Sequence, residues 1–300
     1  MFKKMGSASL VDRIYRPSPN DFYRDYVRRN TPVVITGVAN EWPAVARWSP
    51  EYFRTAFADA RVMFTAWESN NPKNDPEDYY QKRRRLCSRL GPFIDYLHSS
   101  DNTSRDYITQ FPIFKEIPQF KDDIRPLEPY MNIPSYLPAG VREKLQKMPT
   151  MWLGPAQTVT PIHFDSADNF LVQIYGRKKL TLVAPAQSDS LYYPCLRLGH
   201  VIYSPVDVEE PDYDRFPRYR EATPLEATLE SGDILFIPVR WWHHARSVSE
   251  SISLNFWWFS VRSLLRMRHP YLIYKTSRLL NKLKSNSKQS TDYADYSETS

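Results

Sequence analysis

The chain has 300 residues, of which 42% are hydrophobic and 14% aromatic, enough to bury a sizeable core in one large domain or two small ones. No apolar segment follows the first lysines, as it would in a signal peptide, and no apolar run approaches the roughly 18 residues of a membrane span. Two cysteines, Cys87 and Cys195, are too few for a disulfide framework. We therefore expect an intracellular protein, cytoplasmic or nuclear, without a transmembrane segment.

The formal net charge of +6 is concentrated near the C-terminus. Residues 262–288 hold eight lysines and arginines and no acidic residue, whereas residues 1–261 carry 32 basic and 31 acidic side chains. The periodicity of this segment predicts a basic helix over 262–284, followed by a disordered tail over 285–300. This helix is expected to pack on the body of the protein or to form a homodimer contact, and contact with an anionic membrane is the alternative.

The first half of the chain predicts mainly helices. Residues 19–30 have helical spacing, and the β-branched run at 31–38 predicts a strand. Ser49 is the expected N-cap of the next helix, because Pro50 suits a first turn. A loop is predicted at 68–80.

A third helix is predicted over 81–100. Its basic run from Lys82 to Arg85 is interpreted either as a solvated face or as a polyanion site. The chain has 25 prolines against 8 glycines, and the many prolines between 112 and 161 predict irregular structure there.

From residue 149 onward, short β-rich runs alternate with turn signals. Such a density of short strands is typical of an all-β barrel or sandwich. The runs are TMWLG, TPIHF, FLVQIYG, KLTLVAP, DILFIP and SISLNFWWF.

The pair His163 and Asp165 is the first candidate for a metal site. Two residues apart on a strand, these side chains project from the same face and can bind one ion together. About eighty residues downstream, His243 or His244 can supply a second imidazole, but only one of them, because neighbours on a strand point to opposite faces. Two histidines and one carboxylate on one face are the ligands of non-haem Fe(II) oxygenases.

Lys178 is a candidate for binding an anion. By alternation it points into the predicted barrel, where a lysine needs an anionic partner to offset its desolvation, and a dicarboxylate cosubstrate would provide one. The alternative is that Lys178, or its neighbour Lys179, faces solvent.

The segments WLGPAQTVTPIHFDSADNFLVQIYGRKKLTLVAP and GDILFIPVRWWHHARS, with TPVVITGVANEWPA near the N-terminus, carry a resemblance to a known family. Together they resemble the cupin-like branch of the JmjC-domain 2-oxoglutarate and Fe(II) oxygenases. This branch includes the asparaginyl hydroxylase that inhibits hypoxia-inducible factor and small JmjC-only arginyl and lysyl hydroxylases. The resemblance runs from about residue 15 to 261 and implies a mainly β fold with peripheral helices, a double-stranded β-helix or jelly-roll.

The resemblance also implies a domain organisation. We expect an N-terminal segment at 1–14 and a JmjC domain at 15–261. That domain would consist of a helical and irregular part to about 148 and a barrel core from 149.

The resemblance implies roles for individual residues. The expected Fe(II) ligands are His163, Asp165 and the first histidine of the pair, His243. His244 is expected to face away, in a supporting role. The cosubstrate 2-oxoglutarate would meet Lys178, Thr160 and Tyr107 at its C5 carboxylate and Asn255 near its C1 end. Further pocket residues by resemblance are Asn169, Trp152 and Trp257, and the tryptophans also suit ordinary core packing.

The expected function is hydroxylation of a protein side chain (Arg, Lys or Asn) with dioxygen, releasing succinate and CO2. Hydroxylation of a modified tRNA base is one alternative, because the basic segments suit phosphates. A non-catalytic cupin-fold binding or scaffold protein is another, although it would have no use for the cosubstrate residues.

Overall fold

The computed structural model describes residues 9–67, 83–99, 105–133, 136–146, 148–193 and 203–260. The loop predicted at 68–80, Cys195, the basic helix at 262–284 and the tail at 285–300 lie outside the described residues. In the part of the chain that is described, no helix is both long enough and apolar enough to cross a membrane.

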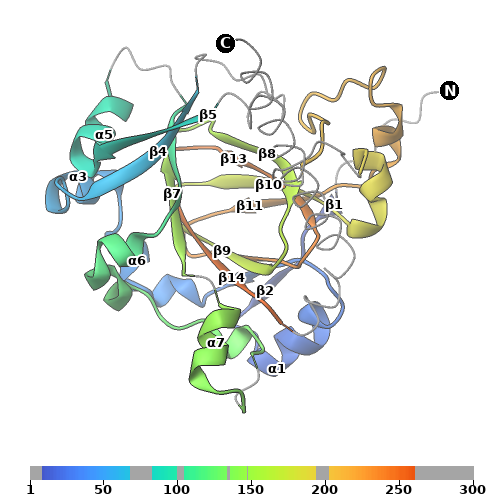
Figure 1. Cartoon of the computed structure of the whole chain (residues 1–300). Helices are drawn as coiled ribbons and strands as arrows, with labels where there is room; N and C mark the ends of the chain where they lie inside the picture. The colour runs from blue at the N-terminus through green and yellow to red at the C-terminus, as the bar shows by residue number, and fades with distance from the viewer. Residues whose placement is uncertain are drawn as a thin grey trace, which may run out of the picture.

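Two β-sheets face each other across a closed interior (Figure 1). The smaller sheet has the order β1 (Ser9–Leu10), β11 (Leu225–Leu229), β10 (Lys178–Val183), β13 (Trp242–Ser247) and β8 (Val159–Phe164). The nine-stranded sheet has the order β2 (Arg13–Tyr15), β3 (Val33–Thr36), β12 (Ile234–Ile237), β9 (Asp168–Tyr175), β14 (Ser251–Trp258), β7 (Thr150–Gly154), β6 (Tyr107–Phe111), β4 (Arg61–Trp67) and β5 (Arg83–Arg89). The mainly β fold predicted from the sequence is thereby confirmed.

Strand alternation divides the apolar residues between two separate clusters. On β9, Leu171 points into the interior and packs with Leu180 and Leu182 of the small sheet. Its neighbours Phe170 and Val172 point to the other face, where they join the main core under the helices. The interior between the sheets is apolar near β10, β11 and β12, which leaves the part around β8, β13 and β14 for polar side chains.

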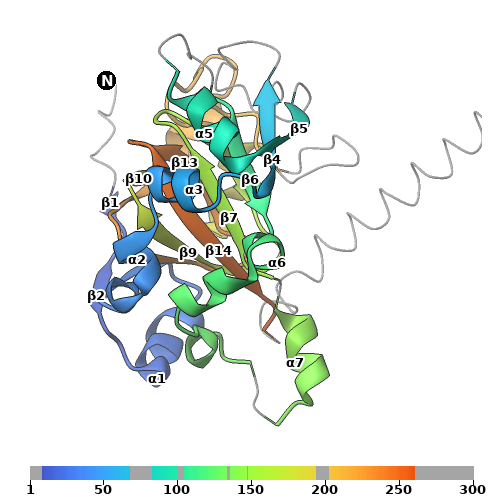
Figure 2. The same cartoon turned by 90° about the vertical axis from the view of Figure 1, so that its left-hand side faces the viewer.

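Short helices cover the outer face of the nine-stranded sheet (Figure 2). They are α1 (Pro19–Phe22), which continues into a π-helical turn at Tyr23–Val27, then α2 (Pro43–Arg47), α3 (Pro50–Ala56), α5 (Leu90–Leu97), α6 (Ile113–Glu116) and α7 (Ala139–Leu145). Short 3-10 helices lie at Ala39–Glu41, Pro118–Asp123, Glu128–Tyr130, Pro185–Leu191 and Pro217–Glu221.

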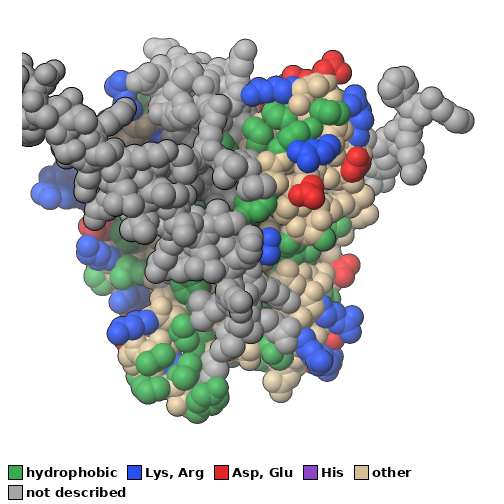
Figure 3. Space-filling model, turned by 45° about the vertical axis from the view of Figure 1, so that its right-hand side comes forward, with side chains coloured by type: hydrophobic (Ala, Val, Ile, Leu, Met, Phe, Trp, Pro, Cys, Tyr) green, Lys and Arg blue, Asp and Glu red, His purple; other side chains and the backbone are tan. Residues whose placement is uncertain are grey.

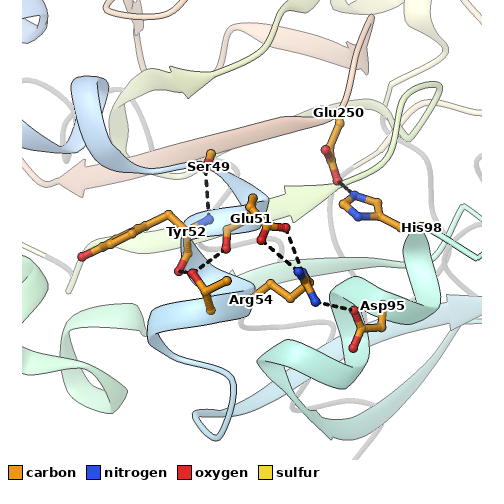
Figure 4. A network of polar contacts seen from close by, with 8 residues as sticks. Ser49, Glu51, Tyr52, Arg54, Asp95, His98 and Glu250 are labelled. Carbon is orange, nitrogen blue, oxygen red and sulfur yellow. Dashed lines mark hydrogen bonds and ion pairs between the residues drawn. The ribbon is translucent and has the colours of Figure 1, made fainter.

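Polar contacts fix α3 and α5 in place (Figure 4). The hydroxyl of Ser49 accepts a hydrogen bond from the backbone N–H of Tyr52 at 3.0 Å, so the N-cap predicted for this helix is confirmed. At the end of α5, His98 Nε2 lies 2.7 Å from Glu250 Oε1 in the β13–β14 turn. This contact connects the helical layer to the hairpin that carries His243.

Other predictions have mixed outcomes. The strand at 31–38, the six strands from residue 149 onward and the start of a helix near residue 19 are confirmed. The helix predicted over 81–100 is wrong for its first part, because residues 83–89 form β5 and only Leu90–Leu97 is helical. The backbone of β5 pairs along the whole length of β4, with Leu86 opposite Phe64, and this pairing outweighs local helical spacing. The sequence does not predict strands β1, β2, β4, β6 and β11.

Candidate metal centre

His163 and His243 lie directly opposite each other on the neighbouring strands β8 and β13. Their ring centroids are 4.2 Å apart. Asp165 follows two residues after His163, and its Oδ2 lies 3.8 Å from His243 Nε2. One nitrogen of each imidazole and one carboxylate oxygen all lie within 4.8 Å of one another, so these three side chains can hold one metal ion.

Backbone carbonyls orient both imidazoles. His163 Nδ1 lies 2.8 Å from the carbonyl oxygen of Pro161, and His243 Nδ1 lies 3.0 Å from that of Trp241. A carbonyl only accepts hydrogen bonds, so each Nδ1 carries a proton and donates it. This arrangement leaves Nε2 as the nitrogen of each ring that can bind a metal.

A β-bulge in β8 aims the side chains of the site. His243 pairs with His163 and Ala245 with Thr160, so two residues on β8 oppose the single residue between them on β13. The bulge contains Pro161, a residue that suits a bulge because it has no N–H to donate. Since the extra residue shifts the alternation, both Thr160 and His163 face the interior, whereas Ile162 joins an apolar cluster on the outer face.

Burial keeps the His163 imidazole neutral. Burial, together with the neighbouring His243, lowers the pKa of His163 to about 4, so the imidazole is neutral at physiological pH. The indole Nε1 of Trp257 donates a hydrogen bond to Asp165 Oδ2 at 2.8 Å. Trp257 therefore orients the carboxylate in addition to lining the interior.

The two adjacent histidines point to opposite faces of β13, as the alternation predicts. His243 belongs to the interior cluster, whereas the Nε2 atom of His244 lies 3.9 Å from Glu209 Oε2 on the outer side of the small sheet. Burial lowers the pKa of His244 to about 4. The geometry thus places His243, and not His244, beside Asp165.

Lys178 lies inside the barrel on β10. Its side chain is buried, its Nζ donates a hydrogen bond to Ser253 Oγ at 2.6 Å, and burial lowers its pKa to about 8. Among the described residues, no carboxylate lies within ion-pair distance of Nζ, whereas Lys179 on the outer face pairs with Glu226 at 2.9 Å. A buried ammonium with no counter-ion among the described residues fits an anionic ligand.

Several other residues predicted for the site line the pocket around Lys178. Tyr107, Trp152, Thr160 and Ala245 line it, and the Tyr107 hydroxyl lies 3.0 Å from Thr160 Oγ1. The indole Nε1 of Trp152 is buried and has no hydrogen-bond partner among the described residues.

Asn255 and Asn169 form a buried pair on β14 and β9. Asn255 Nδ2 donates a hydrogen bond to Asn169 Oδ1 at 3.2 Å. The structure thus places every predicted site residue on an interior face, while their roles in binding stay predictions.

Sequence reasoning missed Ser253. Its hydroxyl is the hydrogen-bond acceptor of Lys178, and it is completely buried. A signal is present in the sequence, because Ser251, Ser253 and Asn255 place polar groups at every second position of an otherwise apolar strand. That pattern indicates a strand with one polar, buried face.

The three side chains of the metal centre fit an Fe(II) ion. Two imidazoles and one carboxylate suit Fe(II) and leave open coordination positions. Asp165, His163 and His243 would hold the ion. Lys178 lines a pocket together with Thr160 and Ala245, and it fits a carboxylate of a bound cosubstrate.

Comparison with known proteins gives the family. The model of the cupin-like domain family matches residues 19–263. The chain belongs to this cupin-like family. The family membership predicted from the sequence motifs is therefore confirmed.

The cupin-like chain is similar to several JmjC proteins. It is 34% identical over 254 residues to lysine-specific demethylase 8 of Xenopus tropicalis, covering 85% of this chain and 54% of that protein. It is 33% identical to lysine-specific demethylase JMJ30 of Arabidopsis thaliana, covering 79% and 52%. It is 26% identical to human bifunctional peptidase and (3S)-lysyl hydroxylase JMJD7, covering 81% of each. The chain spans just over half the length of the first two relatives.

Proposed function

We propose that this chain is an Fe(II)- and 2-oxoglutarate-dependent oxygenase that hydroxylates a protein side chain. One observation carries the proposal: a two-histidine, one-carboxylate cluster lies in the same barrel interior as an ammonium without a described counter-ion. Thr160, three residues before His163 on β8, and Ala245, two residues after His243 on β13, pair with each other and line the pocket that contains Lys178. A metal-only scaffold has no need of a buried lysine in that place.

Each side chain has a distinct part in this function. Bound iron supplies activation of dioxygen, coupled to oxidative decarboxylation of 2-oxoglutarate to succinate and CO2. Lys178 and the hydroxyls of Tyr107 and Thr160 would bind the distal carboxylate of the cosubstrate and fix its direction. Trp257 holds Asp165 by its indole N–H, which keeps the carboxylate in one orientation. The apolar residues around β10 and β12 exclude bulk water from the interior.

The proposed substrate is an arginine, lysine or asparagine side chain of another protein. Its support is the activity named for the similar proteins, which are lysine-specific demethylases and a bifunctional peptidase and (3S)-lysyl hydroxylase. Both chemistries insert one oxygen atom into a C–H bond. Insertion into a C–H bond of a side-chain carbon gives a stable alcohol. Insertion into a C–H bond of an N-methyl group leads to loss of that methyl group as formaldehyde.

The test has two stages. First, purified protein with Fe(II), 2-oxoglutarate and air should form succinate, and His163→Ala should abolish it; full succinate production by His163→Ala would reject the site. Second, cell extract treated with the loaded enzyme is searched by mass spectrometry. A gain of one oxygen atom on a peptide supports hydroxylation, loss of a methyl group indicates demethylation, and modification confined to the tRNA pool would contradict a protein substrate.

The scaffold alternative has its own test. Anaerobic titration with Fe(II) and 2-oxoglutarate gives a metal-to-ligand charge-transfer band only when the 2-oxo acid binds the metal directly. Absence of this band from folded, iron-loaded protein would contradict an oxygenase.

A further inference from the structure

Lys178 differs from the charged groups on the surface by its burial. Figure 3 shows lysine and arginine side chains spread over the surface of the molecule, where water solvates them. The Lys178 side chain lies instead inside the barrel, and its ammonium has three hydrogen-bond donors. Among the described residues, the ammonium donates one hydrogen bond, to the hydroxyl of Ser253 at 2.6 Å. Two N–H groups of Lys178 therefore stay available to a bound ligand.

The contact between Lys178 and Ser253 crosses the interior of the barrel. Lys178 belongs to β10 of the small sheet and Ser253 to β14 of the nine-stranded sheet, and the two sheets face each other (Figure 1). A lysine ammonium stands at the end of a flexible four-carbon stem, so the place of Lys178 on its strand does not fix where the charge lies. The Ser253 hydroxyl supplies this constraint from the opposite sheet.

Ser253 belongs to a row of polar side chains on the interior face of β14. Trp257, four residues further along this face, donates a hydrogen bond to Asp165 of the metal cluster. Asn255 lies between them and pairs with Asn169. At about 3.3 Å per residue, Ser253 and Trp257 are roughly 13 Å apart along the strand. Since β14 is paired on both sides, with β7 and β9, it holds a metal ligand at one end of the site and the ammonium at the other.

Ser253 lies behind Lys178 and outside the pocket itself. Its side chain is completely buried, and it is not among the described residues that line the pocket around Lys178. Ser251, its neighbour on the same face, does line that pocket and accepts a hydrogen bond from Gln173 Nε2 at 3.0 Å. The two serines share strand, face and burial, but Ser253 is the one that accepts a hydrogen bond from the ammonium. An effect of Ser253 on a ligand must therefore pass through Lys178.

We propose that Ser253 is a positioning residue for the cosubstrate: its hydroxyl fixes the Lys178 ammonium at the place where the distal carboxylate of a 2-oxo acid reaches it. This inference rests on the proposed function, because it takes 2-oxoglutarate as the ligand of the pocket. Contact with the carboxylate is assigned to Lys178, and its orientation to Ser253. Holding the ammonium in place before the ligand arrives lowers the entropy lost on binding.

The hydrogen bond also favours the charged form of Lys178. Desolvation lowers the pKa of this lysine to about 8, and an acceptor for the ammonium opposes that effect. The described residues that line the pocket carry no other charge, and their hydroxyls come from Tyr107 on β6, Thr160 on β8 and Ser247 near the end of β13, among others. Tyr107 is the other titratable side chain among them. Removal of the Ser253 hydroxyl should therefore lower the pKa of Lys178 further.

The first measurement is the pKa of Lys178 in the full chain without metal or 2-oxoglutarate. Lysine labelled with carbon-13 at Cε is followed by nuclear magnetic resonance as the pH rises, and the signal missing from Lys178→Met identifies the residue. In Ser253→Ala this signal should titrate at a lower pH, because the charged form has lost its acceptor. Ser251→Ala is the matched control: it makes the same change two residues away on the same face and should leave the titration of Lys178 where it is.

The second measurement is the affinity of the Mn(II)-loaded protein for 2-oxoglutarate, by calorimetry at about pH 6.5 and about pH 8. Ser253→Ala should bind roughly two- to threefold more weakly than the unmodified chain at the lower pH, where the ammonium is charged but less well held. At the higher pH the loss should be roughly tenfold, because less of Lys178 is protonated. Ser253→Thr keeps a hydroxyl and should restore most of the affinity. A merely structural role of Ser253 would lower Tm without this dependence on pH.

Two results would overturn the role of Ser253: an unchanged pKa of Lys178 in Ser253→Ala, or a loss of affinity in Ser253→Ala no larger than that in Ser251→Ala at both pH values. Succinate formation and the charge-transfer band test the proposed function separately. A lowered pKa of Lys178 in Ser253→Ala, in a chain that binds no 2-oxoglutarate, would support Ser253 as the residue that holds the ammonium and contradict the oxygenase. Equal binding of 2-oxoglutarate by the unmodified chain and Ser253→Ala would do the reverse.

Discussion

Lys178 shows how burial prepares a single residue for a ligand. Its ammonium group donates a hydrogen bond to the hydroxyl of Ser253 inside the barrel. Desolvation lowers the pKa of Lys178 to about 8. Protonated Lys178 attracts a carboxylate, whereas the neutral amine does not. Affinity for 2-oxoglutarate should therefore be nearly constant up to about pH 7, fall about twofold by pH 8 and fall roughly tenfold by pH 9, because only the protonated fraction binds.

Isothermal titration calorimetry of 2-oxoglutarate at pH 7, 8 and 9 measures this effect. Lys178→Met is the control, since it should bind weakly at every pH and so reports any pH dependence of the rest of the site. An identical pH dependence of the affinity in Lys178→Met would show that Lys178 is not the group responsible.

The adjacent histidines give a second prediction at the level of residues. His243→Ala removes a donor of the three-residue cluster, so Mn(II) or Fe(II) affinity should fall at least about 100-fold. His244→Ala changes a buried side chain on the outer face, so it should lower thermal stability and retain the metal. Metal content by mass spectrometry and Mn(II) titration by electron paramagnetic resonance test both variants. If His244→Ala lost the metal and His243→Ala retained it, His244 and not His243 would be the metal ligand.

The sequence indicates some site residues more readily than others. Spacing alone puts His163 and Asp165 on one face, and alternation separates His243 from His244. Thr160 shares an interior face with His163 only because of the bulge at Pro161, which a regular alternation does not contain. Ser253 cannot be predicted as a partner of Lys178 from the sequence, because the contact depends on β10 and β14 facing each other across the interior.

At the scale of elements, the turn between β9 and β10 fixes the strand that carries Lys178. Gly176 has a φ of +72°, and a Cβ there would lie 1.9 Å from the carbonyl oxygen of Glu250. Gly176→Ala should therefore lower the free energy of unfolding by about 1–3 kcal/mol or more, through backbone strain and a clash with main chain.

Gly140 on α7 is the control within the same chain. Nothing lies within 4 Å of a Cβ added there, so Gly140→Ala should raise the free energy of unfolding by about 0.5–1 kcal/mol through helix propensity. Urea denaturation of both variants measures the difference. Equal effects of the two substitutions would contradict the role assigned to the turn.

The β4–β5 pair shows why some elements escape sequence reasoning. Residues 83–89 carry one strong apolar residue, Leu86, so neither a period of two nor a period of 3.6 stands out. Their strand structure comes from pairing with β4, a segment beyond the loop that separates them. The strands after residue 149 were predicted because their apolar residues are dense and their turns carry glycine or proline.

At the scale of the whole molecule, the metal cluster connects two strands of one sheet to a loop that enters the other. His163 and His243 belong to β8 and β13, and Asp165 lies in the connection from β8 to β9. The family resemblance anticipated this assembly. Composition and periodicity alone support only a β-rich fold, because nothing local brings residues eighty positions apart onto neighbouring strands.

A metal ion that binds only the folded chain must stabilise the whole fold by linkage. At a free Mn(II) concentration of about 100 times its dissociation constant, the free energy of unfolding should rise by about 2.7 kcal/mol. For a domain of this size, that corresponds to an increase of roughly 5–10 °C in Tm. Differential scanning calorimetry with increasing Mn(II) measures the shift, and the redox-stable ion avoids oxidation of the protein. His163→Ala should show no shift at the same concentration, because a single remaining imidazole and one carboxylate leave the ion weakly held. A shift of equal size in His163→Ala would place the bound ion elsewhere in the molecule and remove the basis for the proposed oxygenase.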